Sequence, residues 1–510
     1  MSLAAVAEAL GCSGENIIWE DGVCGGDVPR DSRSFPWSGG TFRRAEIDSR
    51  SAGAGDLFFC LPGRRADGHD FALAAARAGA CAIVARRNPF APGTALSAPL
   101  PPVFLVPDVA AALRRLAACH RQGCAAHVVG VTGSAGKTSV KEALAQVLAG
   151  HARTERSPLN RNNGIGLPQS MLNADTEAVF WVMEIGISLP GDMDELAALL
   201  RPDTGLILNA GQAHLEGLGD RGPAYYKARL LPHIPDGGRL LYSGDYPDLE
   251  RAVSGHAGRL ENGDLETAVF SFSREDVFCR AVYEGGGEKG RGRYSVIVRE
   301  EKLRRRREAS SPASSGGGMR FSLEAPFRGD MGAENVAAIV ATALRLGLSP
   351  EEIRAGLASA VPPAQRACRS RRGAFLVLDD SYNANPLSAG RMLEAAREMA
   401  AEEGLPLILV MGDMEELGAE SETAHELLGR RMAGTRPRLA FWKGRYGQAV
   451  RKGMAGAGYA GPLLPLAEAG DLAAGLDSRG IGKGLVLFKG SRLNRLEDLA
   501  EAFSRMCEKE

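Results

Sequence analysis

The chain has 510 residues, of which 45% are hydrophobic and 24% are charged, and its formal net charge is −1. This length and composition predict roughly two to four globular domains. The balanced charge argues against a nucleic-acid or membrane-surface partner, and no apolar run reaches the ~20 residues that span a bilayer.

The N-terminus and the cysteines both indicate a cytoplasmic protein. Met1 to Leu10 contain Glu8 but no lysine or arginine, so they predict a short amphipathic helix and no secretory signal. The nine cysteines are scattered and odd in number, which predicts free thiols in a reducing compartment.

The first segment, residues 1–125, alternates short apolar runs with helical patterns. Its predicted elements are strands over 56–61, 80–85 and 103–106 and helices over 70–78 and 109–119. This order predicts an N-terminal αβ domain.

The second segment, residues 126–362, has the strand and helix rhythm of a parallel sheet. Its predicted elements are strands over 128–131, 178–185 and 204–209 and helices over 139–148 and 334–346. Residues 284–318 interrupt this order with glycine, serine and arginine runs. They predict an exposed, partly disordered hairpin insertion.

The third segment, residues 363–510, follows the linker Val361-Pro362-Pro363. Its predicted elements are strands over 375–378, 407–410 and 485–488 and helices over 389–402 and 422–432. The fold class is therefore α/β, with three αβ domains.

A phosphate-binding loop is the most informative motif. It runs Thr132-Gly133-Ser134-Ala135-Gly136-Lys137-Thr138, between an apolar strand and a helix. Glycines let backbone N–H groups turn around an anion, and the helix N-terminus adds positive charge. Lys137 can reach the β- and γ-phosphates of a nucleotide, and the Thr138 hydroxyl can bind Mg²⁺.

Polar residues follow other predicted strands of the second segment. Glu184 ends one strand and His214 follows another, which places both at the sheet edge where a metal is usually held. Asparagines of the 160–166 loop, namely Asn160, Asn162 and Asn163, can donate and accept hydrogen bonds to a ligand or can simply form a turn.

The third segment repeats this placement. Asp379 to Pro386 follows one strand, and its acidic and amide groups can hold a ribose or position a ligand. Lys489, Ser491 and Arg492 follow the last strand and supply positive charge suited to a phosphate or a carboxylate.

Together these residues resemble the Mur ligase family, over nearly the whole chain. The anchors are Asp48-Ser49-Arg50 with Gly55 to Phe58, the 132–138 loop, Asn160 to Pro168, His214 to Gly217, Asp379 to Pro386, Gly412 to Gly418 and Lys489 to Arg492. The resemblance implies a UDP-substrate-binding domain (1–125), a P-loop ATPase-like parallel sheet (126–362), and a Rossmann-like domain (363–510) that binds nucleotide and the incoming dipeptide.

The resemblance also implies a reaction. The strings around Asp379–Asn385 and Gly412–Gly418 favour the branch that adds D-Ala-D-Ala to UDP-N-acetylmuramoyl-tripeptide in peptidoglycan precursor synthesis. ATP phosphorylates the tripeptide carboxylate, and the dipeptide amine attacks the acyl phosphate. The enzyme is expected to act as a monomer, with no nucleic-acid partner and no membrane span.

Each site residue takes an implied role by its place in the family's motifs. Thr138 and Glu184 resemble ligands of a first Mg²⁺, His214 a ligand of a second, and Lys227 a lysine carbamylated to face the metal. The implied uridine contacts are Asp48, Ser49 and Arg50, and the implied ATP contacts outside the loop are Asn335, Arg366, Asp380 and Asn383.

The chain departs from the family's motifs at two of these places. Ala338 stands where a second asparagine contacts adenine in the family, and Ala364-Gln365-Arg366 lacks the usual glycine before the arginine.

Two alternatives stay open. One is a sister ligase, such as a folylpolyglutamate-type enzyme or one that adds another amino acid. The other is a regulatory nucleotide-binding protein with a decayed site. The joint presence of Lys137, Thr138, Glu184, His214 and Lys227 argues against decay.

Overall fold

The computed structural model describes residues 1–508 except 14–15, 19–38, 64–65, 92–93, 95–98, 212–214, 262–264 and 300–317. The chain forms two compact units. The first contains Met1–Val128, Glu155–Ile185 and Glu195–Arg201, and the second contains Val129–Thr154, Gly186–Asp194 and Pro202–Glu510. No helix among the described residues is long and apolar enough to cross a membrane.

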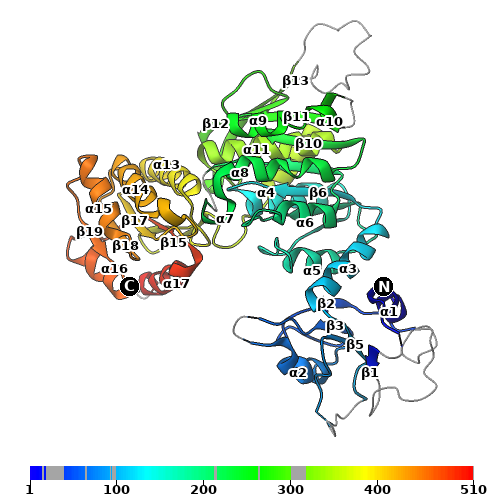
Figure 1. Cartoon of the computed structure of the whole chain (residues 1–510). Helices are drawn as coiled ribbons and strands as arrows, with labels where there is room; N and C mark the ends of the chain where they lie inside the picture. Colours follow the sequence, from blue (N-terminus) through cyan, green and yellow to red (C-terminus); the bar gives the residue numbers. More distant parts are fainter. Residues whose placement is uncertain are drawn as a thin grey trace, which may run out of the picture. The chain divides into compact units, whose positions relative to one another are not determined.

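Figure 1 labels most of the elements up to residue 201 that lie outside the phosphate-binding region. The helices are α1 (Leu3–Leu10), α2 (Ala72–Arg77), α3 (Val109–Gln122), α5 (Gly166–Leu172) and α6 (Asp192–Leu200). The strands are β1 (Ile17–Ile18), β2 (Arg44–Glu46), β3 (Asp56–Phe59), β4 (Ala82–Ala85), β5 (Val103–Leu105), β7 (Thr154–Arg156) and β8 (Phe180–Glu184).

The N-terminal sheet has five strands in the order β1-β5-β4-β3-β2. The strands β2 to β5 are parallel, and β1 is antiparallel to β5. Helix α2 covers one face through Ala72 and Ala75, which pack against Phe58 and Ile83. The predicted strands and helices of this segment are confirmed.

The central part of the second unit carries most of the remaining helices. They are α4 (Lys137–Ala149), α7 (Leu215–Leu218), α8 (Gly222–Ala228), α9 (Pro247–Ser254), α10 (Ala257–Glu261), α11 (Gly329–Arg345) and α12 (Pro350–Ser359). Its strands are β6 (His127–Thr132), β9 (Thr204–Ile207), β10 (Gly238–Ser243), β11 (Leu265–Ser271), β12 (Cys279–Gly286), β13 (Gly292–Arg299) and β14 (Gly318–Ala325).

These strands are ordered β14-β13-β12-β11-β10-β9-β6. The strands from β6 to β12 pair in parallel, as predicted, and β12, β13 and β14 pair antiparallel. Helix α11 packs against β10, β11 and β12.

The 284–318 stretch differs from the prediction in part. A hairpin is present, but its second strand, β13, belongs to the sheet and carries the fully buried Tyr294. The glycine and arginine content concealed the alternation of buried and partly or fully exposed residues along β13. The basic run at 304–307 lies outside the described residues.

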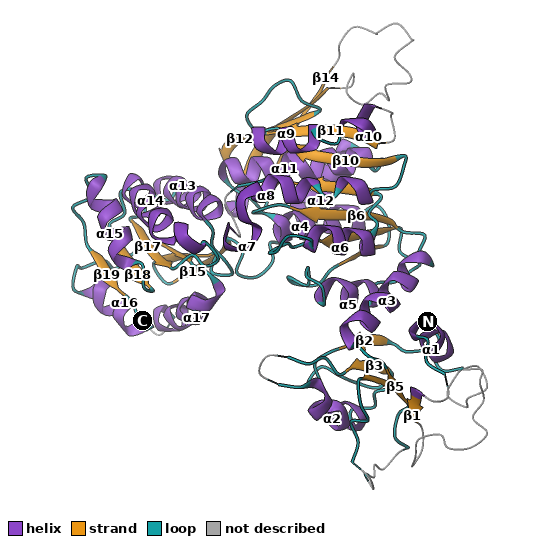
Figure 2. Cartoon of the chain, in the orientation of Figure 1, coloured by secondary structure: helices purple, strands orange, loops and turns teal. Residues whose placement is uncertain are grey.

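The C-terminal part has a sheet of its own (Figure 2). Its strands are β15 (Cys368–Arg372), β16 (Phe375–Asp379), β17 (Leu407–Gly412), β18 (Leu439–Lys443), β19 (Leu463–Pro465) and β20 (Gly484–Lys489). Its helices are α13 (Pro386–Glu402), α14 (Ser421–Gly434), α15 (Gly447–Gly456), α16 (Ala469–Asp477) and α17 (Leu496–Cys507).

This sheet is doubly wound. Its order is β15-β16-β20-β17-β18-β19, with every pair parallel except the β15 edge. Alternate residues of β16 face opposite cores: Leu376 packs with α13 and α14, and Val377 packs with α16 and α17. Helices on both faces of a parallel sheet confirm the Rossmann-like architecture.

Candidate active site

The phosphate-binding loop connects β6 to α4. Gly136 caps α4 with φ +80°, and a Cβ there would lie 2.7 Å from Oδ1 of Asn335. At Gly133 a Cβ would lie 2.9 Å from Cβ of Leu208. Both positions therefore require glycine, one for its backbone angle and both for the close approach of neighbours.

Asn209, two residues after the end of β9, holds this loop in shape. Its Oδ1 accepts a hydrogen bond from the Ala135 N–H at 2.8 Å, and its Nδ2 donates to the Ala135 carbonyl at 3.1 Å. Ser134 is fixed as well, because its N–H donates to the Asn209 carbonyl and its Oγ to the Gly211 carbonyl. The loop is thus pinned by the protein itself.

Cationic groups surround the loop. The Lys137 ammonium donates to the Gly133 carbonyl at 2.8 Å. Arg366 Nη2 lies 3.2 Å from the hydroxyl oxygen of the buried Thr138. Lys227, near the end of α8, is 1% exposed, and burial followed by the nearby charge of Lys137 lowers its pKa to about 7.

Asn335 lies in α11 against Gly136, and its side-chain oxygen can still accept a hydrogen bond. Its Oδ1 is buried and has no hydrogen-bond partner among the described residues. A buried amide oxygen without a partner is costly, so a bound group that supplies a donor would stabilise it. The residue therefore fits a ligand contact at the loop.

The sequence analysis missed two residues of this site. Glu334 is fully buried and accepts hydrogen bonds from Asn209, Ser243 and Arg391. A lone carboxylate in an otherwise apolar helical run was the signal that could have indicated Glu334. The part played by Asn209 depends on the folded loop, and no sequence pattern indicates it.

The C-terminal residues predicted to contact ligands lie together. Lys489 is almost fully buried and is bonded to the Asp380 carboxylate and to the Asn383 carbonyl. Arg366 and Arg492 both lie over the Tyr382 ring, at 4.0 and 5.1 Å from its centroid. Lys489 is therefore committed to an internal ion pair, whereas the two arginines are the cationic groups of this region.

Ser491 is buried, and its hydrogen bonds go to backbone groups. Its Oγ accepts a hydrogen bond from the Glu415 N–H at 2.8 Å, and its own N–H donates to the Asp413 carbonyl. These bonds join the loops that follow β20 and β17.

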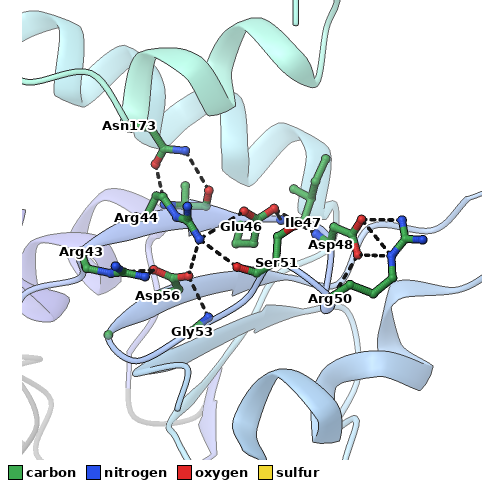
Figure 3. Close-up of polar contacts among 12 residues, drawn as sticks. Arg43, Arg44, Glu46, Ile47, Asp48, Arg50, Ser51, Gly53, Asp56 and Asn173 are labelled. Atoms are coloured by element: carbon green, nitrogen blue, oxygen red, sulfur yellow. Dashed lines mark hydrogen bonds and ion pairs between the residues drawn. The ribbon is translucent and has the colours of Figure 1, made fainter. Parts of the chain in front are cut away.

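The predicted uridine contacts lie on a loop of the first unit (Figure 3). Arg50 donates to both carboxylate oxygens of Asp48 and lowers the pKa of that carboxyl to about 2. Behind them the buried Glu46 accepts the N–H groups of Ile47 and Asp48. Ser49 lies between the paired residues, half-buried.

The asparagine loop is partly structural. Asn163 Oδ1 accepts the N–H groups of Ile165 and Gly166 at the start of α5, which is the work of a turn residue. Asn162 Nδ2 donates to Glu184 at 2.7 Å, and Asn160 is exposed. Glu184 is buried at the end of β8, as predicted.

The predicted metal sites are only partly described. His214 lies outside the described residues. Among the residues that the structure does describe, no three His, Cys, Asp or Glu side chains are grouped to hold an ion.

Replacing Gly136 with alanine is expected to weaken nucleotide binding about tenfold, because the new Cβ is strained and displaces Asn335. Calorimetric titration with ADP measures it. Gly237→Ala is a matched control, since its φ is +79° and nothing lies within 4 Å of its Cβ. Equal affinities for the two variants would contradict the role of the close approach.

Comparisons with known proteins match the chain in three consecutive stretches. These are "Mur ligase family, catalytic domain" over residues 42–121, "Mur ligase middle domain" over 131–343 and "Mur ligase, glutamate ligase domain" over 364–505.

Curated relatives cover most of the chain. The UDP-N-acetylmuramoyl-tripeptide–D-alanyl-D-alanine ligase of Bacillus subtilis is 29% identical over 461 residues, which are 89% of this chain and 91% of that protein. The enzyme of the same name from Escherichia coli is 32% identical over 405 residues, 76% of this chain and 78% of that protein.

Solved structures agree. MurF from Acinetobacter baumannii superposes with a TM-score of 0.76 at 25% identity, covering 99% of this chain and 98% of that one. MurF ligase from Thermotoga maritima, in complex with ADP, gives 0.70 at 27% identity, covering 92% and 98%. With the phosphate-binding loop already in place, these matches show that the chain belongs to the Mur ligase family.

Proposed function

We propose that the chain is an ATP-dependent amide ligase that joins D-Ala-D-Ala to UDP-N-acetylmuramoyl-tripeptide in peptidoglycan precursor synthesis. The observation that carries the proposal is the pinned phosphate-binding loop, with Lys137 and Arg366 beside Thr138. The relatives named for this reaction and the ADP-bound relative support it. We expect a monomer working in the cytoplasm, where free thiols persist.

The chemistry asks the protein mainly to position anions and neutralise charge. Lys137 leaves the Gly133 carbonyl to bind the γ-phosphate as it moves to the tripeptide carboxylate. Arg366 is placed to stabilise the charge on the same phosphate. The transfer of the γ-phosphate releases ADP. The amine of D-Ala-D-Ala then attacks the acyl carbon, a C–N bond forms, the C–O bond to the phosphate breaks, and inorganic phosphate leaves with that oxygen while the amine nitrogen loses a proton to solvent.

Magnesium is expected with the nucleotide. The Thr138 hydroxyl and the Glu184 carboxylate are hard oxygen donors of the kind Mg²⁺ prefers, and they remain the predicted ligands of a first ion, with His214 for a second. The metal would neutralise phosphate charge, and Thr138 and Glu184 would supply the oxygen atoms that bind it.

Lys227 suits a carbamate. Its low pKa leaves the amine partly neutral near pH 7, and only a neutral amine reacts with CO₂. The resulting anion would be attracted by Lys137, whose charge now disfavours the ammonium form of Lys227. We propose that this anion faces the metal side of the site.

Substrate contacts are assigned to each of the three predicted domains. Residues 1–125 would bind the uridine nucleotide through Asp48, Ser49 and Arg50, and residues 126–362 would bind ATP. Residues 363–510 would supply Asp380 and Asn383 to the nucleotide and Arg492 to the incoming dipeptide.

The assignment predicts phosphate release that requires all the substrates. Purified protein is supplied with ATP, Mg²⁺, UDP-N-acetylmuramoyl-tripeptide and D-Ala-D-Ala, and phosphate and the pentapeptide product are measured. A panel of single amino acids and of folate acceptors tests the sister ligases. Turnover independent of D-Ala-D-Ala would refute the assignment, and absence of any ATP turnover would favour a regulatory protein.

A further inference from the structure

A buried carboxylate next to the ATP-binding loop has no part in the mechanism above. Glu334 of α11 is 0% exposed. It accepts hydrogen bonds from Arg391 Nη1 at 2.6 Å, Asn209 Nδ2 at 3.1 Å and Ser243 Oγ at 3.2 Å. A fully buried carboxylate stays ionised only when it is ion-paired and hydrogen-bonded. Removing either charged partner would therefore leave the other as an unpaired buried charge.

Arg391 reaches this carboxylate from the C-terminal part of the chain. It belongs to α13, and its side chain is 12% exposed. Its Nη1 bonds to Glu334, its Nη2 donates to the Tyr246 hydroxyl at 2.7 Å, and its guanidinium lies 5.4 Å from the centre of the Phe272 ring. Helix α13 thus places one arginine side chain among Glu334, Tyr246 and Phe272 of the central part of the second unit.

The connection continues to the loop through Asn209. The Oδ1 of Asn209 accepts from the Ala135 N–H, and Nδ2 donates both to the Ala135 carbonyl and to Glu334. Both N–H donors and one acceptor position of the amide group are used, and the Glu334 carboxylate can only accept. Glu334 therefore selects the one amide orientation that can also hold Ala135.

Helix α13 also touches the loop directly. Its N-cap residue, Asn385, donates to the Ser134 carbonyl at 3.1 Å. Two successive loop residues, Ser134 and Ala135, are consequently tied to α13, one directly and one through Asn209, Glu334 and Arg391.

We propose that Arg391 and Glu334 are positioning residues that couple the docking of α13 to the shape of the ATP-binding loop. Neither residue is assigned a direct contact with nucleotide or acceptor. Their ion pair holds Asn209, and Asn209 holds the loop, so α13 docking and nucleotide binding favour each other. The inference rests on the proposed ATP-binding role of the loop.

The test compares two ion pairs made by the same helix. Arg391→Met and Glu334→Gln break the proposed pair. Arg328→Met and Glu402→Gln break the pair at the other end of α13, where Arg328 also bonds to Gly290 and Tyr283. ADP affinity is measured by calorimetry without acceptor, and kcat and KM for ATP by phosphate release. Thermal unfolding checks that each variant is folded.

Arg391→Met and Glu334→Gln are each expected to raise the Kd for ADP and the KM for ATP about tenfold, with kcat changed less. The double variant should bind ADP no more weakly than the weaker of the two single variants, because both substitutions break the same ion pair. Arg391→Lys should restore part of the affinity.

Three results overturn the proposal: unchanged ADP affinity in Arg391→Met, additive losses in the double variant, or an equal loss in Arg328→Met. If Glu334→Gln does not fold, the two arginine variants still decide the question. The ADP titration needs no acceptor, so failure of the ligase assignment would leave this result interpretable.

Discussion

Alanine at position 137 is expected to lower the rate of D-Ala-D-Ala-dependent phosphate release by about a thousandfold. Lys137 begins α4, and in the proposed mechanism it is the cation that binds the migrating γ-phosphate, where charge accumulates in the transition state. The loss should fall mainly on kcat, since the backbone nest, which Asn209 still holds in shape, can bind the other phosphates. Steady-state kinetics with varied ATP separates kcat from KM.

A surface lysine provides the control. Lys452→Ala removes an ammonium that is 72% exposed and paired only on the surface with Glu426, and its kinetics should match the unsubstituted protein. Activity of Lys137→Ala within tenfold of the unsubstituted protein would mean that phosphate transfer does not depend on this cation.

Alanine at position 227 is expected to lower the same rate by about a hundredfold. The variant removes a buried group whose carbamate would be an anion beside Lys137. Lys227→Glu restores a carboxylate near that place, and added acetate or formate can enter the space left by alanine. Both should recover part of the activity.

The pH dependence of this effect has a definite sign. The neutral fraction of Lys227 falls as the pH drops below its pKa of about 7, so less amine is available to react with CO₂. Added bicarbonate should therefore stimulate the protein more at acid than at alkaline pH, and Lys227→Ala should show no stimulation. Activity of Lys227→Ala equal to that of the unsubstituted protein would end the carbamate hypothesis.

The fold could be predicted wherever hydrophobic periodicity was strong. The apolar runs that became β6, β9, β16, β17 and β20 each lie between helical patterns, and all of them are parallel strands. Strand β13 was missed because its buried residues, such as Tyr294, alternate mainly with arginine and serine inside a low-complexity stretch.

The candidate site was predictable where one segment carries the chemistry. The loop from Gly133 to Thr138 is contiguous, and its glycines meet geometric demands that hold for any phosphate nest. The supports of the loop were not predictable, because Asn209, Glu334 and Arg391 come from three distant segments and acquire meaning only from their hydrogen bonds. Likewise the sequence predicts Lys489 as a ligand contact, whereas in the structure its ammonium group is paired with the Asp380 carboxylate.

The two outer strands of the C-terminal sheet bear on how the protein behaves at high concentration. Exposed strand edges are templates on which other chains can add strands and aggregate. The β15 edge carries three arginines, Arg369, Arg371 and Arg372, and the β19 edge ends in Pro465, which has no N–H to offer. Charge at one edge and a proline at the other thus disfavour strand addition at both ends of this sheet, which should reduce association of the folded protein through these edges.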